Sequence, residues 1–283
     1  MGISSRLNRE GEKPGRLPEI VIEEPVENEY LEFDVETEVG ELGLINMKSE
    51  YLWWCEEEEW YNAGFAAMNF KILFPDRIAE LDLYSKWEKM KAEYKKHLDS
   101  ENWSIVARQA MFLKILFPDK VGQLGLEEFK QSLFENLASE FDAEWFKIFE
   151  YVKCVKVLYP DQNITELIKK HSLTTEWDKR CQDLSANLSE NKELYRVSCS
   201  LMGLRVAFLD GVKINKQQWE EMEGLYRERT QKDLWYNALS EAANLKILSA
   251  KEVKVTNQGI ELVMGDKEDF KDGLAERPER RLK

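Results

Sequence analysis

Apolar and small side chains recur at helical spacing in five segments of this chain. Each segment opens on a bulky residue and carries further apolar or small residues three, four and seven positions later, as in Trp103, Val106, Ala107 and Ala110. The other four segments open on Trp60, Trp145, Leu194 and Trp235. Positions 0, 3, 4 and 7 form one stripe on a helix of 3.6 residues per turn. The pattern therefore predicts five amphipathic helices of about 15 residues each.

A short motif closes each of these helices and shows that the chain is an internal repeat. Residues 71–77 read KILFPDR, residues 114–120 read KILFPDK and residues 156–161 read KVLYPD. Degenerate copies follow as RVAFLD at 205–210 and KILS at 246–249. The proline ends the helix, because its ring cannot continue the hydrogen-bond ladder and its predecessor is pushed out of the helical region. A period of about 42 residues is typical of a stacked supersecondary unit.

A second helix is predicted after each Pro-Asp turn, at residues 87–94, 129–137, 177–184 and 219–226. Each repeat is then a helical hairpin. The array begins in mid-unit, because residues 39–44 copy residues 121–126 and predict a lone first helix near residues 46–57. At the other end apolar residues between 253 and 264 alternate around Asn257-Gln258-Gly259, which is typical of a β-hairpin. We expect this hairpin to cover the last hydrophobic face of the array; one more irregular helix is the alternative.

These patterns predict an all-α fold, in which tandem helical hairpins form an α-solenoid with a small C-terminal β-hairpin cap. We place the array at residues 42–264 and the cap near residues 251–264. Residues 1–41 are expected to be a disordered acidic leader, and residues 265–283 a disordered charged tail.

The net charge of −14 is concentrated in the leader, where residues 17–41 contain ten acidic side chains and no lysine or arginine. Within it, Leu31, Phe33 and Val35 alternate with Glu32, Asp34 and Glu36. An acidic-hydrophobic pattern is typical of disordered interaction segments, or of a strand that pairs with an exposed sheet edge. These six residues are a candidate interaction tail; the alternative is a solubilising leader that binds nothing.

One basic residue recurs eleven positions after the start of each predicted first helix. The five are Lys71, Lys114, Lys156, Arg205 and Lys246. Eleven residues are about three helical turns, so each lies on or beside the apolar stripe. A cation in the last turn can satisfy the carbonyls of its own helix end and pair with the turn aspartate. The functional alternative is a ladder of groove cations that grips an acidic ligand.

The chain carries no sign of catalytic chemistry. It has no Gly-rich phosphate loop, nucleophile-elbow, zinc-protease or calcium-loop motif, and we expect no enzyme activity and no cofactor. Four cysteines without C-x-x-C spacing and two histidines argue against a zinc site. The acidic balance argues against nucleic acid, so the nine tryptophans are expected to be core residues. Apolar runs are too short for a membrane span, and a cytoplasmic protein is expected.

The KILFPD units, the stretch from Lys246 to Thr256 and the Pro278-Glu279-Arg280-Arg281 tail resemble a group of uncharacterised bacterial tandem helical-repeat proteins. The resemblance covers roughly residues 40–283 and brings no activity with it. The array is also similar to TPR-like and HEAT-like α-solenoids, although the 34-residue TPR spacing is missing. Binding along a groove is implied only by this likeness of architecture.

The leading hypothesis is thus a non-enzymatic scaffold or adaptor that binds a protein or peptide partner through the repeat array. A structural or self-assembling repeat protein is the main alternative, and an enzyme or nucleic-acid-binding module is a weaker one. The oligomeric state and the identity of the partner stay open.

Overall fold

The structure is a computed structural model that describes residues 33–190, 192–209 and 214–264. It confirms an all-α repeat fold with a small C-terminal β-hairpin. The first helices of the repeats form an inner layer: α3 (Trp60–Leu73), α5 (Trp103–Leu116), α7 (Lys147–Leu158), α10 (Leu194–Phe208) and α12 (Trp235–Ser249). The second helices form an outer layer: α2 (Gly40–Glu56), α4 (Trp87–Asp99), α6 (Leu126–Phe141), α9 (Thr174–Ser189) and α11 (Lys216–Gln231).

The Pro-Asp turns lead into short 3-10 helices that carry the chain outward. These are η1 (Pro75–Leu81), followed by η2 (Leu83–Lys86), and η3 (Pro118–Leu124); in the third repeat α8 (Ile164–Lys170) takes their place. Proline occupies the first turn of η1 and η3, where its missing N–H is not needed. Asp82 and Gly125 then end these helices at equivalent positions with φ of +46° and +66°. Glycine and aspartate both tolerate this left-handed conformation, which redirects the chain.

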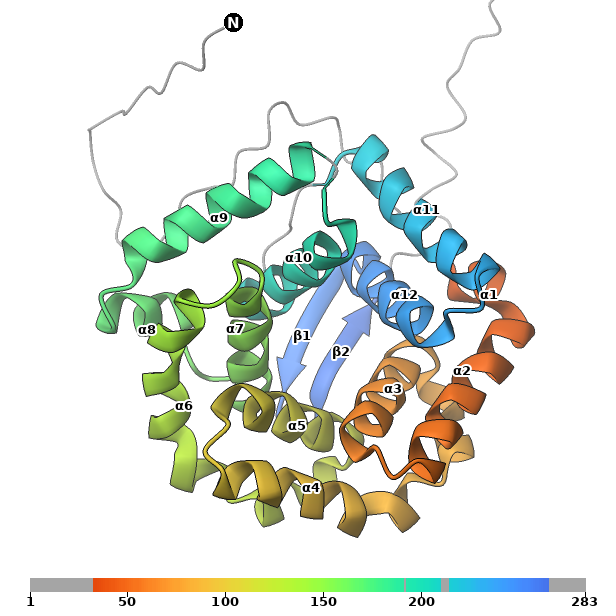
Figure 1. Cartoon of the computed structure of the whole chain (residues 1–283), viewed down its shortest axis with the longest axis horizontal. Coiled ribbons are helices and arrows are strands. Elements are labelled where there is room, and N and C mark those ends of the chain that lie inside the picture. Colours follow the sequence, from red (N-terminus) through yellow and green to blue (C-terminus); the bar gives the residue numbers. More distant parts are fainter. Residues whose placement is uncertain (1–32, 191, 210–213, 265–283) are drawn as a thin grey trace, which may run out of the picture.

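The array closes on itself into a ring (Figure 1). Each inner helix packs on the next, from α3 through α5, α7 and α10 to α12, and α12 packs back on α3 and α2. The outer helices lie around this inner ring, each against the inner helices beside it. Closure buries the two end faces that an open solenoid would expose.

The β-hairpin therefore has a different place from the one expected for it. Strands β1 (Glu252–Thr256) and β2 (Gly259–Val263) pair antiparallel, with Val253 opposite Leu262. They lie at the centre of the ring, against α5, α7 and α10, while the first repeat covers the last face. Gly259, at φ +120°, lies against Ile115 near the end of α5. The hairpin thus closes the ring at the end where the inner helices have their C-termini.

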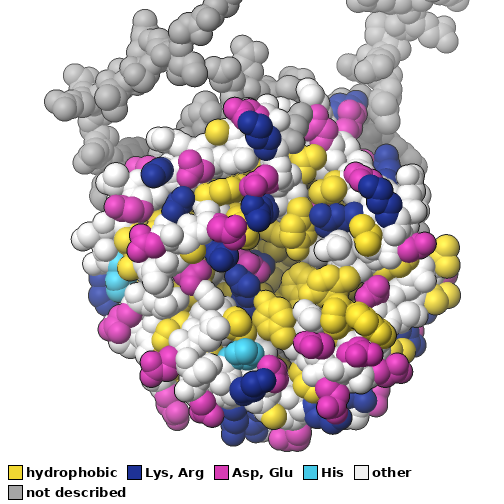
Figure 2. Space-filling view, viewed as in Figure 1, with side chains coloured by type: hydrophobic (Ala, Val, Ile, Leu, Met, Phe, Trp, Pro, Cys, Tyr) yellow, Lys and Arg dark blue, Asp and Glu magenta, His cyan; other side chains and the backbone are white. Residues whose placement is uncertain are grey.

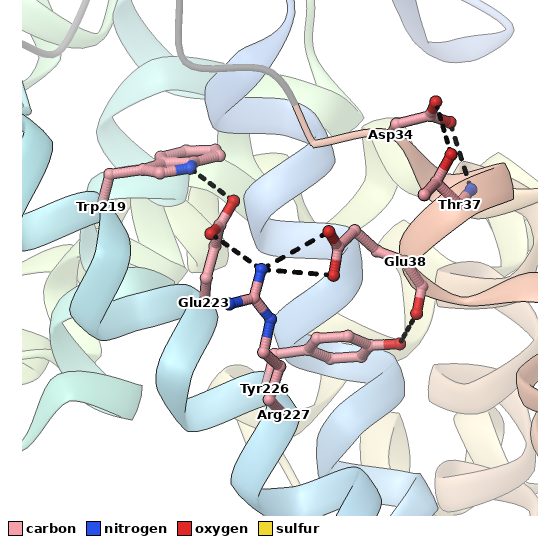
Figure 3. Close-up of polar contacts among 7 residues, drawn as sticks. All are labelled: Asp34, Thr37, Glu38, Trp219, Glu223, Tyr226 and Arg227. Atoms are coloured by element: carbon pink, nitrogen blue, oxygen red, sulfur yellow. Dashed lines mark hydrogen bonds and ion pairs between the residues drawn. The ribbon is translucent and has the colours of Figure 1, made fainter.

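The end of the expected leader belongs to the ring. Residues 33–41 run through the short helix α1 (Val35–Glu38) into α2, and Phe33, Val35 and Val39 are buried. The Phe33 ring meets the edge of Tyr226 on α11 at 5.5 Å, and the Tyr226 hydroxyl donates to the Glu38 carbonyl at 3.2 Å (Figure 3). Residues 33–41, expected to belong to a disordered leader, are therefore part of the folded array. Residues 1–32 and 265–283, expected to be disordered, lie outside the described residues.

The tryptophans divide between the layers. Trp87, Trp177 and Trp219 on outer helices are buried, as expected of core residues. The four that open inner helices, namely Trp60, Trp103, Trp145 and Trp235, are only half-buried. Trp53 on α2 is 48% exposed. The outer helices α4, α9 and α11 insert their tryptophans into the core, whereas the tryptophans of α2 and those that open the inner helices stay partly exposed.

Candidate functional site

The recurring cations connect each inner helix to the next. Lys71 donates to the Ile115 carbonyl at the end of α5, and Lys114 donates to the Leu158 carbonyl at the end of α7 at 3.0 Å. Arg205 donates to the Ala250 carbonyl just after α12 at 2.9 Å. A cation near a helix C-terminus is favourable because unpaired carbonyls and the helix dipole both attract positive charge.

Lys246 completes this ladder across the point of closure, because its ammonium group donates to the Leu73 carbonyl at the end of α3, at 2.8 Å. Lys156 alone stays within its own turn, where it donates to the carbonyls of Pro160 and Gln162. In four of the five copies the cation thus reaches a carbonyl at the end of the following helix, and only Arg205 of these four also donates to its own helix end, at Leu209 (3.4 Å). The sequence interpretation assigns these cations to the carbonyls of their own helix ends.

The aspartate of a Pro-Asp turn acts electrostatically on the recurring cation of the repeat before it. Burial lowers the pKa of Lys71, Lys114 and Lys246, and Asp119, Asp161 and Asp76 respectively oppose that shift. For Lys114, which is 3% exposed, the pKa falls to about 8. These cations hold the ring together. Their role as groove cations for an acidic ligand stays a prediction.

The inner helices turn another set of positions toward the ring's axis, on the side opposite the apolar stripe. By helix geometry these are positions 1, 5, 8 and 12, and the hollow that they line is called the lumen here. The five residues at each position form four layers. Position 1 holds Tyr61, Ser104, Phe146, Tyr195 and Tyr236; position 5 holds Phe65, Arg108, Glu150, Cys199 and Ser240. Position 8 holds Met68, Met111, Lys153, Met202 and Ala243; position 12 holds Ile72, Ile115, Val157, Val206 and Ile247.

Burial increases from layer to layer. Most side chains of the first two layers are half-buried, all of the third are buried, and the aliphatic fourth layer lies nearest the hairpin. Figure 2 shows the corresponding hollow at the centre of the ring, with hydrophobic side chains gathered on one side and charged ones on the other. The lumen is therefore a cup about two layers deep, closed below by packed side chains and the hairpin.

An ion pair joins two neighbouring helices in the wall of this cup. Arg108 on α5 contacts the Glu150 carboxylate on α7 at 3.1 Å, and Arg108 also lies 3.5 Å from the Tyr61 hydroxyl on α3. The Arg108 and Glu150 side chains are 22% and 24% exposed, so solvent reaches both. On the other wall Phe65 lies 5.7 Å from Phe112 and 5.4 Å from Tyr236, ring centre to ring centre. One wall is thus charged and the other aromatic.

A buried carboxyl group lies behind the lumen, between α10 and α12. Glu241 is fully buried, accepts a hydrogen bond from Ser198 at 2.8 Å and faces Arg229 at 3.4 Å. Burial raises the pKa of Glu241 to about 8, against the opposing effects of Ser198 and Arg229. Asn244 donates to the Ser198 hydroxyl at 3.1 Å and completes the network. A carboxyl group with no exposed surface cannot reach a substrate, so this network holds the two helices together.

Burial also affects the thiols and tyrosine hydroxyls at and beside the lumen. Burial raises the pKa of Cys154 and Cys199 to about 12, so both thiols stay protonated at neutral pH. Burial likewise raises the pKa of Tyr61, Tyr195 and Tyr236. A nucleophile or general base requires a pKa shifted the other way. The raised pKa values therefore do not activate these thiols and hydroxyls as nucleophiles.

A second candidate surface lies on the outside of the ring. The outward face of α2 carries Leu42, Ile45, Leu52 and Trp53, which are 70%, 55%, 42% and 48% exposed. We call these four residues the α2 row. Helical spacing places them along one face, and Glu56 to Glu59 follow directly, all exposed. An exposed cluster of large apolar side chains on a folded protein marks an interaction site.

The candidate interaction tail divides at residue 33. Leu31 and Glu32 lie outside the described residues, as does the side chain of Glu36. Phe33 and Val35 pack into the ring, and Asp34 accepts hydrogen bonds from the backbone and hydroxyl of Thr37 at 3.4 and 2.9 Å. Arg227 on α11 contacts Glu38 at 3.4 Å (Figure 3). In the described part of the tail, the apolar side chains are therefore already used within the chain.

Sequence reasoning missed both the lumen and the α2 row. Charged residues at position 5 of two successive repeats, Arg108 and Glu150, interrupt an otherwise apolar pattern and could have drawn attention to the inner face. Large apolar residues at 42, 45, 52 and 53 could have been recognised as a second stripe on the first helix, beside the buried one at Leu44, Met47 and Tyr51.

No protein-family model matches this chain, and neither the curated proteins nor the solved structures yield a match. Within the part of the chain that the structure describes, no helix combines the length and apolar character needed to cross a membrane.

Proposed function

We propose that the protein is a non-enzymatic scaffold or adaptor, and that a partner protein docks on the α2 row. The observation that carries this proposal is the row itself. Full burial of a large apolar side chain contributes about 1.5–3 kcal/mol, so four of them on one helix face could supply much of the affinity of a specific complex. The aromatic Trp53 is the residue type that most often anchors such interfaces.

The charges around the row indicate the chemistry of the partner. Glu56, Glu57 and Glu59 form no ion pair with any of the residues that the structure describes, and Glu58 reaches Lys89 only at 3.6 Å. An acidic flank steers a basic surface toward the apolar row and repels an acidic one. The partner that fits is a protein segment with apolar anchors flanked by lysine or arginine.

Self-association through the same row is the second candidate, because a second copy would also present an apolar helix face. Two antiparallel α2 helices would bring Glu56–Glu59 of one copy toward Glu41 of the other, and like charges there oppose pairing, although Arg77, which contacts Glu41 at 2.8 Å, offsets part of this repulsion. Stacking through the ends of the array lacks a surface, because α12 packs against α2 and α3. We therefore favour a different, basic partner. The free state of Cys55, Cys154, Cys181 and Cys199 is in keeping with a cytoplasmic location.

The test compares captured proteins across matched variants. The full-length chain, Ile45→Asp, and Tyr84→Ala as a control at another exposed apolar side chain (65% exposed, on η2) are used as bait in an extract of the native host. Partners retained by the parent and the control but lost with Ile45→Asp are then purified, and their affinity is measured directly.

We expect Ile45→Asp to weaken the binding of a basic partner by 100-fold or more. This factor corresponds to a loss of about 2.7 kcal/mol in the free energy of binding. Neutralising Glu56, Glu57 and Glu59 to glutamine should slow association and reduce its salt dependence. Equal binding to Ile45→Asp and to the parent would refute the proposal. Light scattering gives the remaining outcome: a dimer that Ile45→Asp dissociates would assign the row to self-association.

A further inference from the structure

Lys153 lies at the floor of the lumen without an acidic partner. It stands at position 8 of α7, in a layer whose other members are three methionines and an alanine, and it is 4% exposed. No hydrogen bond or ion pair joins its ammonium group to another residue in the described ranges. Glu150, one turn earlier on the same helix, is paired with Arg108 instead.

This placement is costly for the protein by itself. Burying an ammonium group away from water is unfavourable unless it is paired and hydrogen-bonded. The methionine and alanine side chains of its own layer offer Lys153 no charged acceptor. Side chains on a helix lean toward its N-terminus, which here directs the ammonium group up into the cup. Its charge lowers the pKa of Cys154 on α7 and Cys199 on α10, against the larger effect of burial. Cys199 belongs to the second layer, which is consistent with that direction, whereas Cys154 directly follows Lys153 in the chain.

The charge count of the cup gives the class of ligand. Among the residues at the four lumen positions, Arg108 and Lys153 are two cations against one carboxylate, Glu150, which leaves one positive charge on these side chains in a protein whose net charge is −14. A further carboxylate, Glu140, accepts a hydrogen bond from Ser104 but lies on the outer helix α6. A ligand with a single negative charge would balance this excess. A phosphate dianion would face the repulsion of Glu150 with only one surplus cation to offset it.

We propose that the lumen binds a small monocarboxylic acid with an aromatic or apolar body. Lys153 pairs with the carboxylate from below, and the exposed edge of Arg108 and the Tyr61 hydroxyl donate to it from the side. The half-buried rings of Phe65 and Tyr236, with the buried Phe112 packed behind Phe65, contact the body of the ligand. The site is distinct from the α2 row, because the two share no residue.

The experiment uses the purified full-length chain with phenylacetate as the probe. Calorimetry and the thermal midpoint are compared for phenylacetate, for neutral phenylacetamide of the same shape, and for inorganic phosphate. Variants are Lys153→Met, which keeps the length of the side chain without its charge, and Lys95→Met as a control on the exposed side of α4.

We expect phenylacetate to bind the parent and Lys95→Met equally, to bind Lys153→Met at least tenfold more weakly, and to outcompete both phenylacetamide and phosphate. Arg108→Gln, at a half-buried position, keeps the test valid if Lys153→Met fails to fold, and it should also weaken phenylacetate about tenfold. Three results would overturn the proposal: no response of the parent to phenylacetate, equal binding by the parent and Lys153→Met, or a preference for phosphate. If Lys153→Met had a higher thermal midpoint than the parent and the parent bound no acid, Lys153 would be a structural residue only.

Discussion

Gly203 marks a close approach between two inner helices. It lies in the middle of α10, and a Cβ atom added there would stand 2.5 Å from the carbonyl oxygen and 2.9 Å from the carbonyl carbon of Phe149 on α7. Both are backbone atoms, so no side-chain rotation can relieve the contact. Gly203→Ala therefore requires the two helices to move apart.

The expected cost follows from two opposed effects. In an exposed helix interior, replacing glycine by alanine stabilises the helix by about 1 kcal/mol. Here, ordinary contact requires a separation of roughly 0.9 Å more between α10 and α7, and overpacking of this kind costs about 1–3 kcal/mol, occasionally more. A closed ring transmits the displacement to its other contacts, since no free end can absorb it. We expect a net loss of about 2 kcal/mol in the free energy of unfolding.

Urea denaturation provides the assay, with Gly224→Ala as the matched control. Gly224 also lies inside a helix, α11, but a Cβ atom there would meet no atom within 4 Å. The control should gain about 0.5–1 kcal/mol through helix propensity. If Gly203→Ala were as stable as Gly224→Ala, then α7 and α10 would not pack at this distance, and the inner ring would have to be wider.

Three further predictions concern single side chains. Phe33→Ala should lower the free energy of unfolding by about 3–4 kcal/mol, because Phe33 is 2% exposed and packs on Tyr226; a loss below about 1 kcal/mol in urea denaturation would mean that residues 33–39 are not part of the ring. Lys114 has a pKa of about 8 in the folded chain and an ordinary value of 10.5 when unfolded. The parent should therefore gain stability relative to Lys114→Met as the pH rises from 8 toward 10. A difference in the free energy of unfolding that stays constant over this range would contradict the burial of this ammonium group. Glu241 has a pKa of about 8 in the folded chain and an ordinary value of 4.5. The parent should therefore lose stability relative to Glu241→Gln as the pH rises from 5 to 8. If the thermal midpoints of the two proteins, plotted against pH, ran parallel, that result would count against a buried, protonated carboxyl group.

The sequence was sufficient for the elements but not for their closure. The stripe at positions 0, 3, 4 and 7 and the proline after each KILFPD-type motif located the inner helices, since both effects act within one helix. Closure depends instead on the angle between neighbouring repeats. That angle is set by contacts such as Gly203 on Phe149, whose partners lie on different helices, and no single-helix pattern reports it.

The same limit applies to the recurring cations and to the candidate sites. The sequence located Lys71 and Lys246 at the ends of their helices, yet the carbonyls that they reach belong to Ile115 and Leu73, on the helices beside them. A lysine side chain spans the distance to a neighbouring helix as easily as to its own last turn, and only the three-dimensional register decides between them. Lys153 could not be recognised for a similar reason, because its lack of a partner depends on what the other four helices bring to its layer.

The claim on which the rest depends is that the array closes into a ring, and a distance across the seam tests it most directly. Spin labels at Thr37 on α1 and Glu228 on α11, both exposed, lie beside the Glu38–Arg227 contact, 191 positions apart in the chain. A reference pair at Lys95 on α4 and Gln131 on α6 reports on consecutive outer helices. With the half-buried Cys55 and Cys199 replaced by serine, pulsed electron paramagnetic resonance should give the seam pair a short, narrow distance comparable to that of the reference pair. A seam distance far longer than the reference, or a broad distribution, would show an open array and contradict the account.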